Sequence, residues 1–233
     1  MKQARFTTVL FDLDHTLLDS DASEALAFEQ ALRAAGVDEP HRHLPAYDRI
    51  NTALWHAVER QEITPGQVRT TRFEQLIAEA GLDADPTQLS DGFALGLGQH
   101  GELYPGVLEM LEAVAEHASL GLVTNGLSDI QRARIERLGI ARYFQAVVIS
   151  AEVGCSKPFT AIFDIAFERL RNPSKASSLM VGDSLSSDIQ GGTNYGINTC
   201  WYNWRNTTPG ELDRFDFEIA DLDLLPPIVV ATT

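Results

Sequence analysis

Residues 7–19 read TTVLFDLDHTLLD, and this stretch decides the fold. Its apolar first half predicts a short buried strand over Thr7–Phe11. Asp12 and Asp14 follow where that strand ends. In open α/β sheets, ligands bind beyond the carboxyl ends of the strands. These two carboxylates are therefore the first candidates for a functional site.

Residues 20–102 have a different, helical pattern. Apolar residues recur at helical spacing, and Thr64 followed by Pro65 and Gln67 predicts a capping box at one helix start. The expected helices run from Ser20 to near Gly36, from Ala46 to Val58, from Pro65 to Gly81, and between Pro86 and Gln99. No strand pattern interrupts them, so this stretch is predicted to be an all-helical insert.

Helices and strands alternate from residue 103 onward. The expected helices are Val107–His117, Ser128–Leu138, Phe159–Leu170 and Ser187–Tyr195, and the expected strands are Leu120–Thr124, Ala146–Ser150, Ser178–Val181, Ile197–Tyr202 and Phe217–Ala220. Such alternation with apolar strands predicts a parallel sheet that helices cover on both faces. The predicted fold class is α/β: a doubly wound, Rossmann-like core of residues 1–19 and 103–233, with residues 20–102 inserted as a helical cap domain.

Polar residues follow the predicted core strands. Beyond Asp12 and Asp14 these are Thr124, Asn125, Lys157, Asp183 and Asp188. Four carboxylates at one sheet edge repel one another unless a cation holds them, and short Asp side chains without His or Cys favour Mg²⁺. A metal together with Lys157 and hydroxyl or backbone donors suits a phosphate group. In such a site Asp12 could attack phosphorus while Asp14 handles the leaving-group proton.

The segment 11–19 resembles the first signature, D-x-D-x-T, of the haloacid dehalogenase-like (HAD) hydrolases. Thr124-Asn125-Gly126, then Lys157-Pro158, then Gly182-Asp183 with Asp188 resemble the three later signatures, in the same order. The resemblance implies that Asp12 is the nucleophile and Asp14 the general acid/base. It also implies that Thr124, Asn125 and Lys157 bind the phosphoryl group. By the same match, Asp12, the Asp14 carbonyl and Asp183 hold Mg²⁺, while Asp188 supports the metal's water or Lys157.

A narrower resemblance covers residues 10–18, 181–192 and 194–203. These segments are similar to bacterial pyrimidine 5′-nucleotidases of the same superfamily, which implies a phosphoric monoester hydrolase acting on UMP, dUMP and dTMP. Three alternatives stay open: a HAD phosphatase for sugar phosphates or phosphoglycolate, a 2-haloacid dehalogenase, and a non-catalytic binding protein on the same scaffold. The phosphatase is favoured because Asp14 supplies an acid/base that dehalogenation does not need, and because no motif residue is missing.

Composition restricts the partners. The chain of 233 residues has a formal net charge of −15, from 18 Lys and Arg against 33 Asp and Glu. Nucleic-acid polymers and acidic membranes need clustered basic residues, so the expected partner is a small phosphate ester, with a nucleoside monophosphate favoured. Cys155 and Cys200 make no disulfide framework, and no apolar run reaches the length of a membrane-spanning helix. We expect a cytoplasmic protein, as a monomer or weak homodimer.

Simpler structural roles compete for some of these residues. Asp183 and Asp188 also fit the start and cap of a helix, and Asn125 before glycine is a strong turn signal. The joint occurrence of four motifs favours the functional role. Trp55 and Phe73 fit helical core positions at least as well as a platform on which a nucleobase stacks.

Overall fold

The computed structural model describes residues 4–230. Its centre is one sheet of six parallel strands in the order β3-β2-β1-β4-β5-β6. The strands are β1 (Thr8–Phe11), β2 (Ser119–Thr124), β3 (Phe144–Ile149), β4 (Ser178–Gly182), β5 (Asn198–Tyr202) and β6 (Phe217–Ile219). The strand order reverses between β1 and β4, and such a switch point is where ligand sites form in open α/β sheets.

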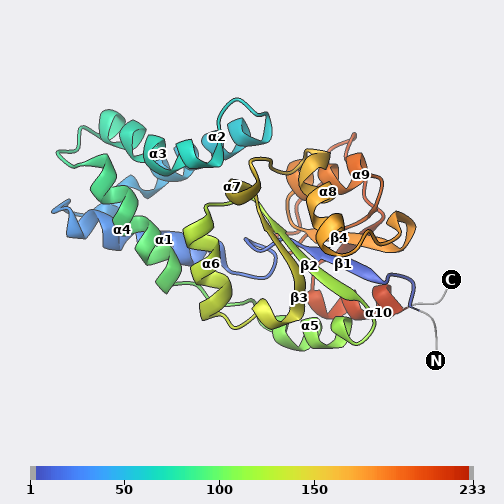
Figure 1. Ribbon diagram of the computed structural model, residues 1–233. Helices are drawn as coiled ribbons and strands as arrows, with labels where there is room; N and C mark the ends of the chain where they lie inside the picture. The colour runs from blue at the N-terminus through green and yellow to red at the C-terminus, as the bar shows by residue number, and fades with distance from the viewer. Residues whose placement is uncertain (1–3, 231–233) are drawn as a thin grey trace.

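Helices cover both faces of this sheet (Figure 1). They are α5 (Val107–Ala115), α6 (Ser128–Arg137), α8 (Thr160–Arg169), α9 (Gln190–Tyr195) and α10 (Leu225–Val230), whereas the short helix α7 (Ser150–Val153) directly follows β3. Successive side chains of a strand point to opposite faces, and β1 illustrates this. Val9 and Phe11 pack into the apolar cluster that contains residues of α5 and α10, whereas Leu10 packs into the cluster that contains residues of α8. Both faces are therefore apolar, as a doubly wound sheet requires.

Short turns of helix connect the main elements. Four are 3₁₀ turns: η1 (Pro40–His43), η2 (Ala141–Tyr143), η3 (Lys175–Ser177) and η5 (Leu222–Leu224). The fifth, η4 (Leu185–Ile189), is a π-helical turn that joins β4 to α9. Because η4 carries residues that follow β4, it lies beside the switch point of the sheet.

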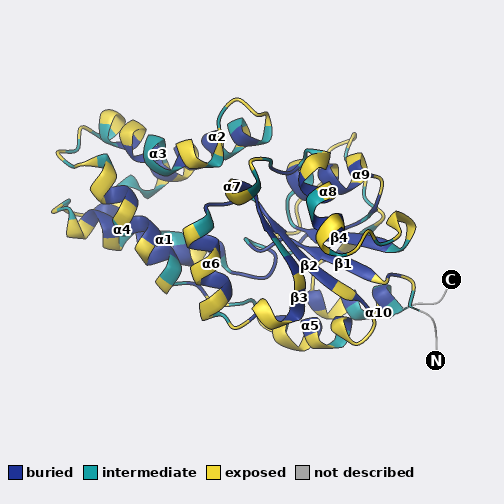
Figure 2. Cartoon of the chain, in the orientation of Figure 1, coloured by how far each residue is buried: buried dark blue, intermediate teal, exposed yellow. Residues whose placement is uncertain are grey.

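Four helices form a separate group beside the sheet (Figure 1). They are α1 (Ser20–Ala34), α2 (Leu44–Glu59), α3 (Pro65–Ala80) and α4 (Pro86–Gln99). Four aromatic rings, from Phe28, Tyr47, Phe73 and Phe93, lie 4.7–5.9 Å apart in the contacting pairs at the centre of this group. Ile130 of α6 joins the same apolar cluster, so the group rests on α6. The buried residues of these helices face one another and the exposed ones face outward (Figure 2).

The predicted fold class is confirmed: a six-stranded parallel sheet flanked by helices, with an all-helical insert after the first strand. The capping box at Thr64 is confirmed too, since its backbone N–H donates to Oε1 of Gln67 at 2.8 Å. Several helices differ from their predictions: α7 and α10 were not expected, and α2 begins at Leu44 rather than at Ala46. The segment after β4 begins as the π-helical turn at Leu185, two residues before the expected start, and the Ser184 hydroxyl accepts from the Ser187 N–H at its entrance (3.2 Å). Domain boundaries at 19/20 and 102/103 stay a prediction.

Within residues 4–230, no helix is both long and apolar enough to cross a membrane.

Candidate active site

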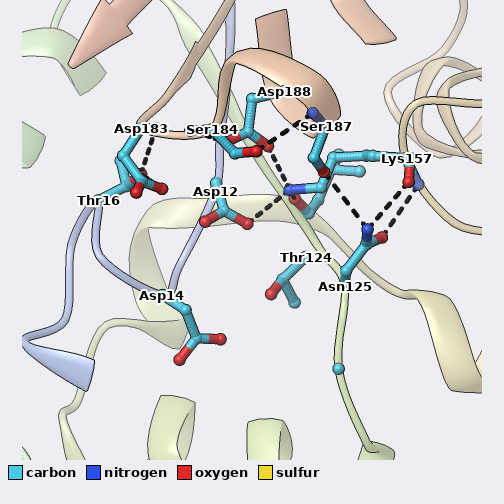
Figure 3. A network of polar contacts seen from close by, with 12 residues as sticks. Asp12, Asp14, Thr16, Thr124, Asn125, Lys157, Asp183, Ser184, Ser187 and Asp188 are labelled. Carbon is cyan, nitrogen blue, oxygen red and sulfur yellow. Dashed lines mark hydrogen bonds and ion pairs between the residues drawn. The ribbon is translucent and has the colours of Figure 1, made fainter. Parts of the chain in front are cut away.

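The carboxyl ends of β1, β2 and β4 meet at one edge of the sheet, where a cavity of about 550 Å³ separates the core from the helical insert. Asp12 directly follows β1, and Asp183 directly follows β4. Six of the seven predicted site residues line this cavity: Asp12, Asp14, Asn125, Lys157, Asp183 and Asp188. The seventh, Thr124, ends β2 and is fully buried. The structure therefore brings together residues that lie up to 176 positions apart in the sequence (Figure 3).

Lys157 lies at the centre of the site (Figure 3). Its side chain is 1% exposed, and its Nζ donates to Asp12 Oδ1 (2.5 Å) and to the carbonyl of Val123 (2.7 Å). Nζ also forms an ion pair with Asp188 Oδ1 at 2.6 Å. Burial alone would lower the pKa of Lys157, but the two carboxylates outweigh it and raise the pKa above its usual value. Lys157 is therefore a fixed positive charge beside Asp12.

The Asp12 carboxyl, beside the lysine, is strongly perturbed by its burial. Burial raises its pKa from 3.8 to about 7; Lys157 opposes this rise, and the neighbouring carboxylates of Asp188 and Asp14 add to it. A buried carboxylate with so little solvation is a better nucleophile than a hydrated one, and further positive charge would favour its ionised form.

Asp12, Asp183 and Asp188 form a cluster in which one carboxylate oxygen from each residue lies within 4.8 Å of the other two. Burial, followed by repulsion from Asp188 and Asp12, raises the pKa of Asp183 well above 3.8. The Thr16 hydroxyl accepts from the Asp183 backbone N–H at 3.1 Å and fixes this residue against the first motif. Oxygen-only donors that repel one another suit a hard divalent cation such as Mg²⁺. The residues present therefore fit a metal ion.

The glycine before Asp183 permits the close packing of this cluster. A Cβ on Gly182 would lie 2.2 Å from Oδ2 of Asp188, so only glycine leaves room for that carboxylate against the end of β4. The same oxygen accepts from the Ser184 backbone N–H at 3.1 Å. Asp188 is thus held on one side by backbone and on the other by Lys157.

Asp14 is held by three donors, and sequence reasoning identified none of them. Arg134 Nη1 donates to Oδ1 (2.7 Å), the Ser20 hydroxyl donates to the same oxygen (2.6 Å), and Gln131 Nε2 donates to Oδ2 (2.6 Å). Burial by itself raises the pKa of Asp14, but Arg134, with help from Ser20 and Gln131, lowers it below 3.8. In this arrangement Asp14 is ionised, which is the form that accepts a proton.

A sequence signal for Arg134 does exist. Ile130 and Arg134 lie four residues apart on one face of α6, and Leu138 continues this spacing at the C-cap of the helix. Ile130 and Arg134 are both buried, at 5% and 3% exposure. An arginine on an apolar helix face predicts a buried guanidinium that needs a partner, whereas the uncharged polar side chains of Ser20 and Gln131 carry no comparable signal.

Thr124 at the end of β2 and Asn125 after it each form hydrogen bonds with other residues of the site. The Thr124 hydroxyl accepts from Gln131 Nε2 at 2.8 Å, and Gly126 leaves space for that glutamine, because a Cβ there would lie 2.8 Å from its side chain. Asn125 braces the lysine loop: its Nδ2 donates to the Lys157 carbonyl and its Oδ1 accepts from the Lys157 N–H, both at 3.0 Å. The phosphate-binding roles of Thr124 and Asn125 stay predictions.

Residues 9–202 match the family of haloacid dehalogenase-like hydrolases, and the chain belongs to this family. The pyrimidine 5′-nucleotidase PynA of Streptococcus pneumoniae is 37% identical over 84% of this chain and 83% of its own length. The pyrimidine 5′-nucleotidase YjjG of Escherichia coli is 36% identical over 84% of this chain and 85% of its own length.

Two solved structures extend the comparison. The HAD-hydrolase YfnB of Bacillus subtilis, determined with bound magnesium, superposes with a TM-score of 0.89 at 32% identity, covering 97% of this chain and 99% of its own. A 2-haloacid dehalogenase from Pseudomonas syringae superposes with a TM-score of 0.71 at 28% identity, covering 96% and 97% of the two chains. The predicted family, fold class and enzyme class, a hydrolase, are confirmed.

Proposed function

We propose that this chain is a Mg²⁺-dependent phosphomonoester hydrolase that forms an aspartyl-phosphate on Asp12 and acts on pyrimidine nucleoside 5′-monophosphates such as UMP, dUMP and dTMP. One observation carries the proposal: a buried carboxylate lies 2.5 Å from a buried lysine, within a cluster of three carboxylates, at the switch point of the sheet. The similarity to two pyrimidine 5′-nucleotidases over more than four fifths of the chain supports the substrate class.

Asp12, Asp183 and the backbone carbonyl of Asp14 are the proposed ligands of Mg²⁺. Asp188 keeps Lys157 in place beside them. When bound, the ion supplies positive charge that neutralises the phosphoryl oxygens. Magnesium bound to the structure of YfnB supports the choice of metal.

The proposed reaction has two steps. A carboxylate oxygen of Asp12 attacks phosphorus, the bond from phosphorus to the ribose 5′-oxygen breaks, and that oxygen takes a proton from Asp14, which acts in its protonated form in this first step and is left ionised. Asp14 then accepts a proton from water, whose oxygen attacks the same phosphorus and releases inorganic phosphate and the Asp12 carboxylate. Lys157 stabilises the charge on the transferring group in both steps. The second step uses Asp14 in its ionised form, which the contacts from Arg134, Ser20 and Gln131 favour.

We further propose that residues 20–102 act as a cap domain over the core formed by residues 1–19 and 103–233. In this arrangement the leaving group of the substrate lies between the cap and the core, because residues of both line the same cavity. A cytoplasmic location, a monomeric or weakly dimeric state and the lack of nucleic-acid or membrane partners stay predictions from composition.

A phosphate-release screen tests the proposed function. With Mg²⁺ present, UMP, dUMP and dTMP should be hydrolysed faster than ribose 5-phosphate, glucose 6-phosphate and phosphoglycolate. Preference for sugar phosphates or phosphoglycolate would place the chain with another HAD phosphatase, and halide release from a 2-haloacid without Mg²⁺ would identify a dehalogenase. No turnover of any of these substrates would favour the non-catalytic alternative.

A further inference from the structure

The helical insert contributes a second polar group to the cavity, away from the lysine and the carboxylate cluster. We call Glu24 of α1, Asn51 of α2 and Arg72 of α3 the cap polar cluster. All three line the cavity, and none contacts Asp12 or Lys157. The phosphate chemistry described above uses none of them.

Arg72 is the unusual member of the cap polar cluster. It is 3% exposed, its guanidinium lies 4.5 Å from the centre of the Phe93 ring, and its Nε and Nη2 have no hydrogen-bond partner within residues 4–230. The two side chains that accept from its Nη1 are both neutral: Asn51 Oδ1 at 3.2 Å and the Tyr47 hydroxyl at 3.3 Å. A buried, incompletely paired guanidinium is costly to the fold, and such groups persist mainly at functional sites.

Arg72 fixes the orientation of the Asn51 amide. A guanidinium only donates hydrogen bonds, so the amide oxygen must face Arg72 and the amide nitrogen must face away from it. That nitrogen donates to Glu24 Oε2 at 3.3 Å and has a second N–H to offer. The Asn51 amide nitrogen, a donor, and the Glu24 carboxylate, an acceptor, therefore lie side by side at the cavity wall.

The cap polar cluster lies at a suitable separation from the phosphate end of the cavity. Asn51, Trp55 and Glu59 recur every four residues and line the cavity along one face of α2. Glu59 accepts from the hydroxyl of Ser186, two residues from Asp188, at 3.1 Å. From Glu59 to Asn51 the helix rises about 12 Å. A substrate whose phosphate lies beside Asp12 would therefore pass Trp55 before it reaches Asn51.

The charge of the insert restricts what can bind there. Its cavity-lining residues include one arginine, Arg72, and four acidic residues, Asp21, Glu24, Asp48 and Glu59. This excess of carboxylates repels a leaving group that carries a second phosphate or a carboxylate. A neutral leaving group with hydrogen-bonding edges is favoured instead.

We infer that the cap polar cluster binds the pyrimidine base, with Asn51 donating to a ring carbonyl, Glu24 accepting from the adjacent ring N3–H, and Trp55 stacking on the ring. Arg72 is a positioning residue that holds the Asn51 amide. This inference rests on the proposed function, because only a nucleotide substrate places a base at this depth. Uracil and thymine both present a carbonyl beside an N3–H, which matches the donor and acceptor of the cluster. Stacking on an aromatic ring is a common way to hold a base.

Kinetics with two substrates test this inference. UMP and ribose 5-phosphate share the phosphate and the ribose, but only UMP has a base. Asn51→Ala and Glu24→Ala should each lower kcat/KM for UMP about 10- to 100-fold, because each removes one hydrogen bond to the base. The same variants should leave ribose 5-phosphate hydrolysis within about twofold of the parent. Glu29→Ala, on the outer side of α1 where Glu29 pairs with Arg33, is the matched control and should change neither rate.

A second measurement uses the unaltered protein, so it does not depend on how the variants fold. UMP methylated at N3 has no N3–H to donate, and it should be hydrolysed at least about tenfold less efficiently than UMP. Equal efficiency for the two nucleotides, or equal losses on UMP and ribose 5-phosphate in the variants, would overturn the inference while leaving the nucleotidase assignment intact. If the unaltered protein hydrolyses ribose 5-phosphate but not UMP, the proposed function itself fails.

Discussion

Replacing Asp12 with Asn should stabilise the metal-free protein while it removes the activity. Asp12 is 6% exposed, and burial raises the pKa of its carboxyl from 3.8 to about 7, even with Lys157 opposing the rise. Keeping that carboxyl ionised in the folded protein costs about 4 kcal/mol, at about 1.36 kcal/mol for each pH unit between the two values. Asn has nearly the same shape, carries no charge, and still offers an oxygen to Nζ of Lys157.

The size of this stabilisation depends on pH. Below about pH 4 the Asp12 carboxyl is protonated in the folded and the unfolded protein alike, so the cost is absent. The cost grows as pH rises from 3.8 to about 7, because over this range the unfolded chain has released a proton that the folded protein retains, and it stays at its full value above that range. Asp12→Asn should therefore match the parent near pH 4 and exceed its free energy of unfolding by about 4 kcal/mol near pH 8.

Urea unfolding in EDTA across this pH range measures the difference in free energy of unfolding between the parent and Asp12→Asn. A second series with Mg²⁺ tests whether the same carboxylate binds the metal. Mg²⁺ should stabilise the parent more than the variant and narrow the gap, because the ion neutralises the same carboxylates. Asp38→Asn, at an exposed position after α1, controls for the loss of one surface charge. A variant no more stable than the parent near pH 8 without metal, or a stability difference that does not change with pH, would show that the buried Asp12 carboxylate does not destabilise the fold.

Three further predictions concern the neighbours of Asp12. Arg134→Met removes the cation that lowers the pKa of Asp14, so the limb of the pH–rate profile that reports Asp14 should move to higher pH; an unmoved limb would count against the acid/base role. Lys157→Met leaves the Asp12 and Asp188 carboxylates without their buried partner, and it should cost about 3–5 kcal/mol in urea unfolding and at least about 100-fold in kcat. An unchanged free energy of unfolding would mean that the ion pairs of Lys157 with Asp12 and Asp188 do not stabilise the fold. Chelation should abolish phosphate release and added Mg²⁺ should restore it, with Asp183→Asn needing about 10- to 100-fold more Mg²⁺ for half-maximal rate; turnover that survives exhaustive chelation contradicts the metal assignment.

The fold could be predicted because its signals are local. Each core strand is a short apolar run followed by polar residues, so Asp12, Thr124 and Asp183 could be assigned to one sheet edge because the carboxyl ends of parallel strands lie there. Helix boundaries in the insert followed from capping residues such as Thr64. The π-helical turn at Leu185 was missed because a change from i+4 to i+5 bonding leaves no mark on apolar periodicity.

The parts of the site that were not predicted arise from contacts across the fold. Arg134 donates to Asp14, 120 positions away, and to the Ser23 hydroxyl of the insert, 111 positions away. Such contacts depend on how α6 packs between the core and the insert, which periodicity within one helix does not specify. Arg72 presents the same difficulty, since its burial follows from the ring of Phe93 on another helix.

The proposed mechanism requires a covalent phosphoryl group on Asp12. Rapid acid quenching of the parent protein during turnover of UMP labelled in its phosphate, followed by peptide mapping, tests this. We predict label on the peptide that contains Asp12, lost on treatment with hydroxylamine and absent from the Asp12→Asn variant. Label on a different residue, or phosphate release from UMP at the parent rate by Asp12→Asn, would contradict the account.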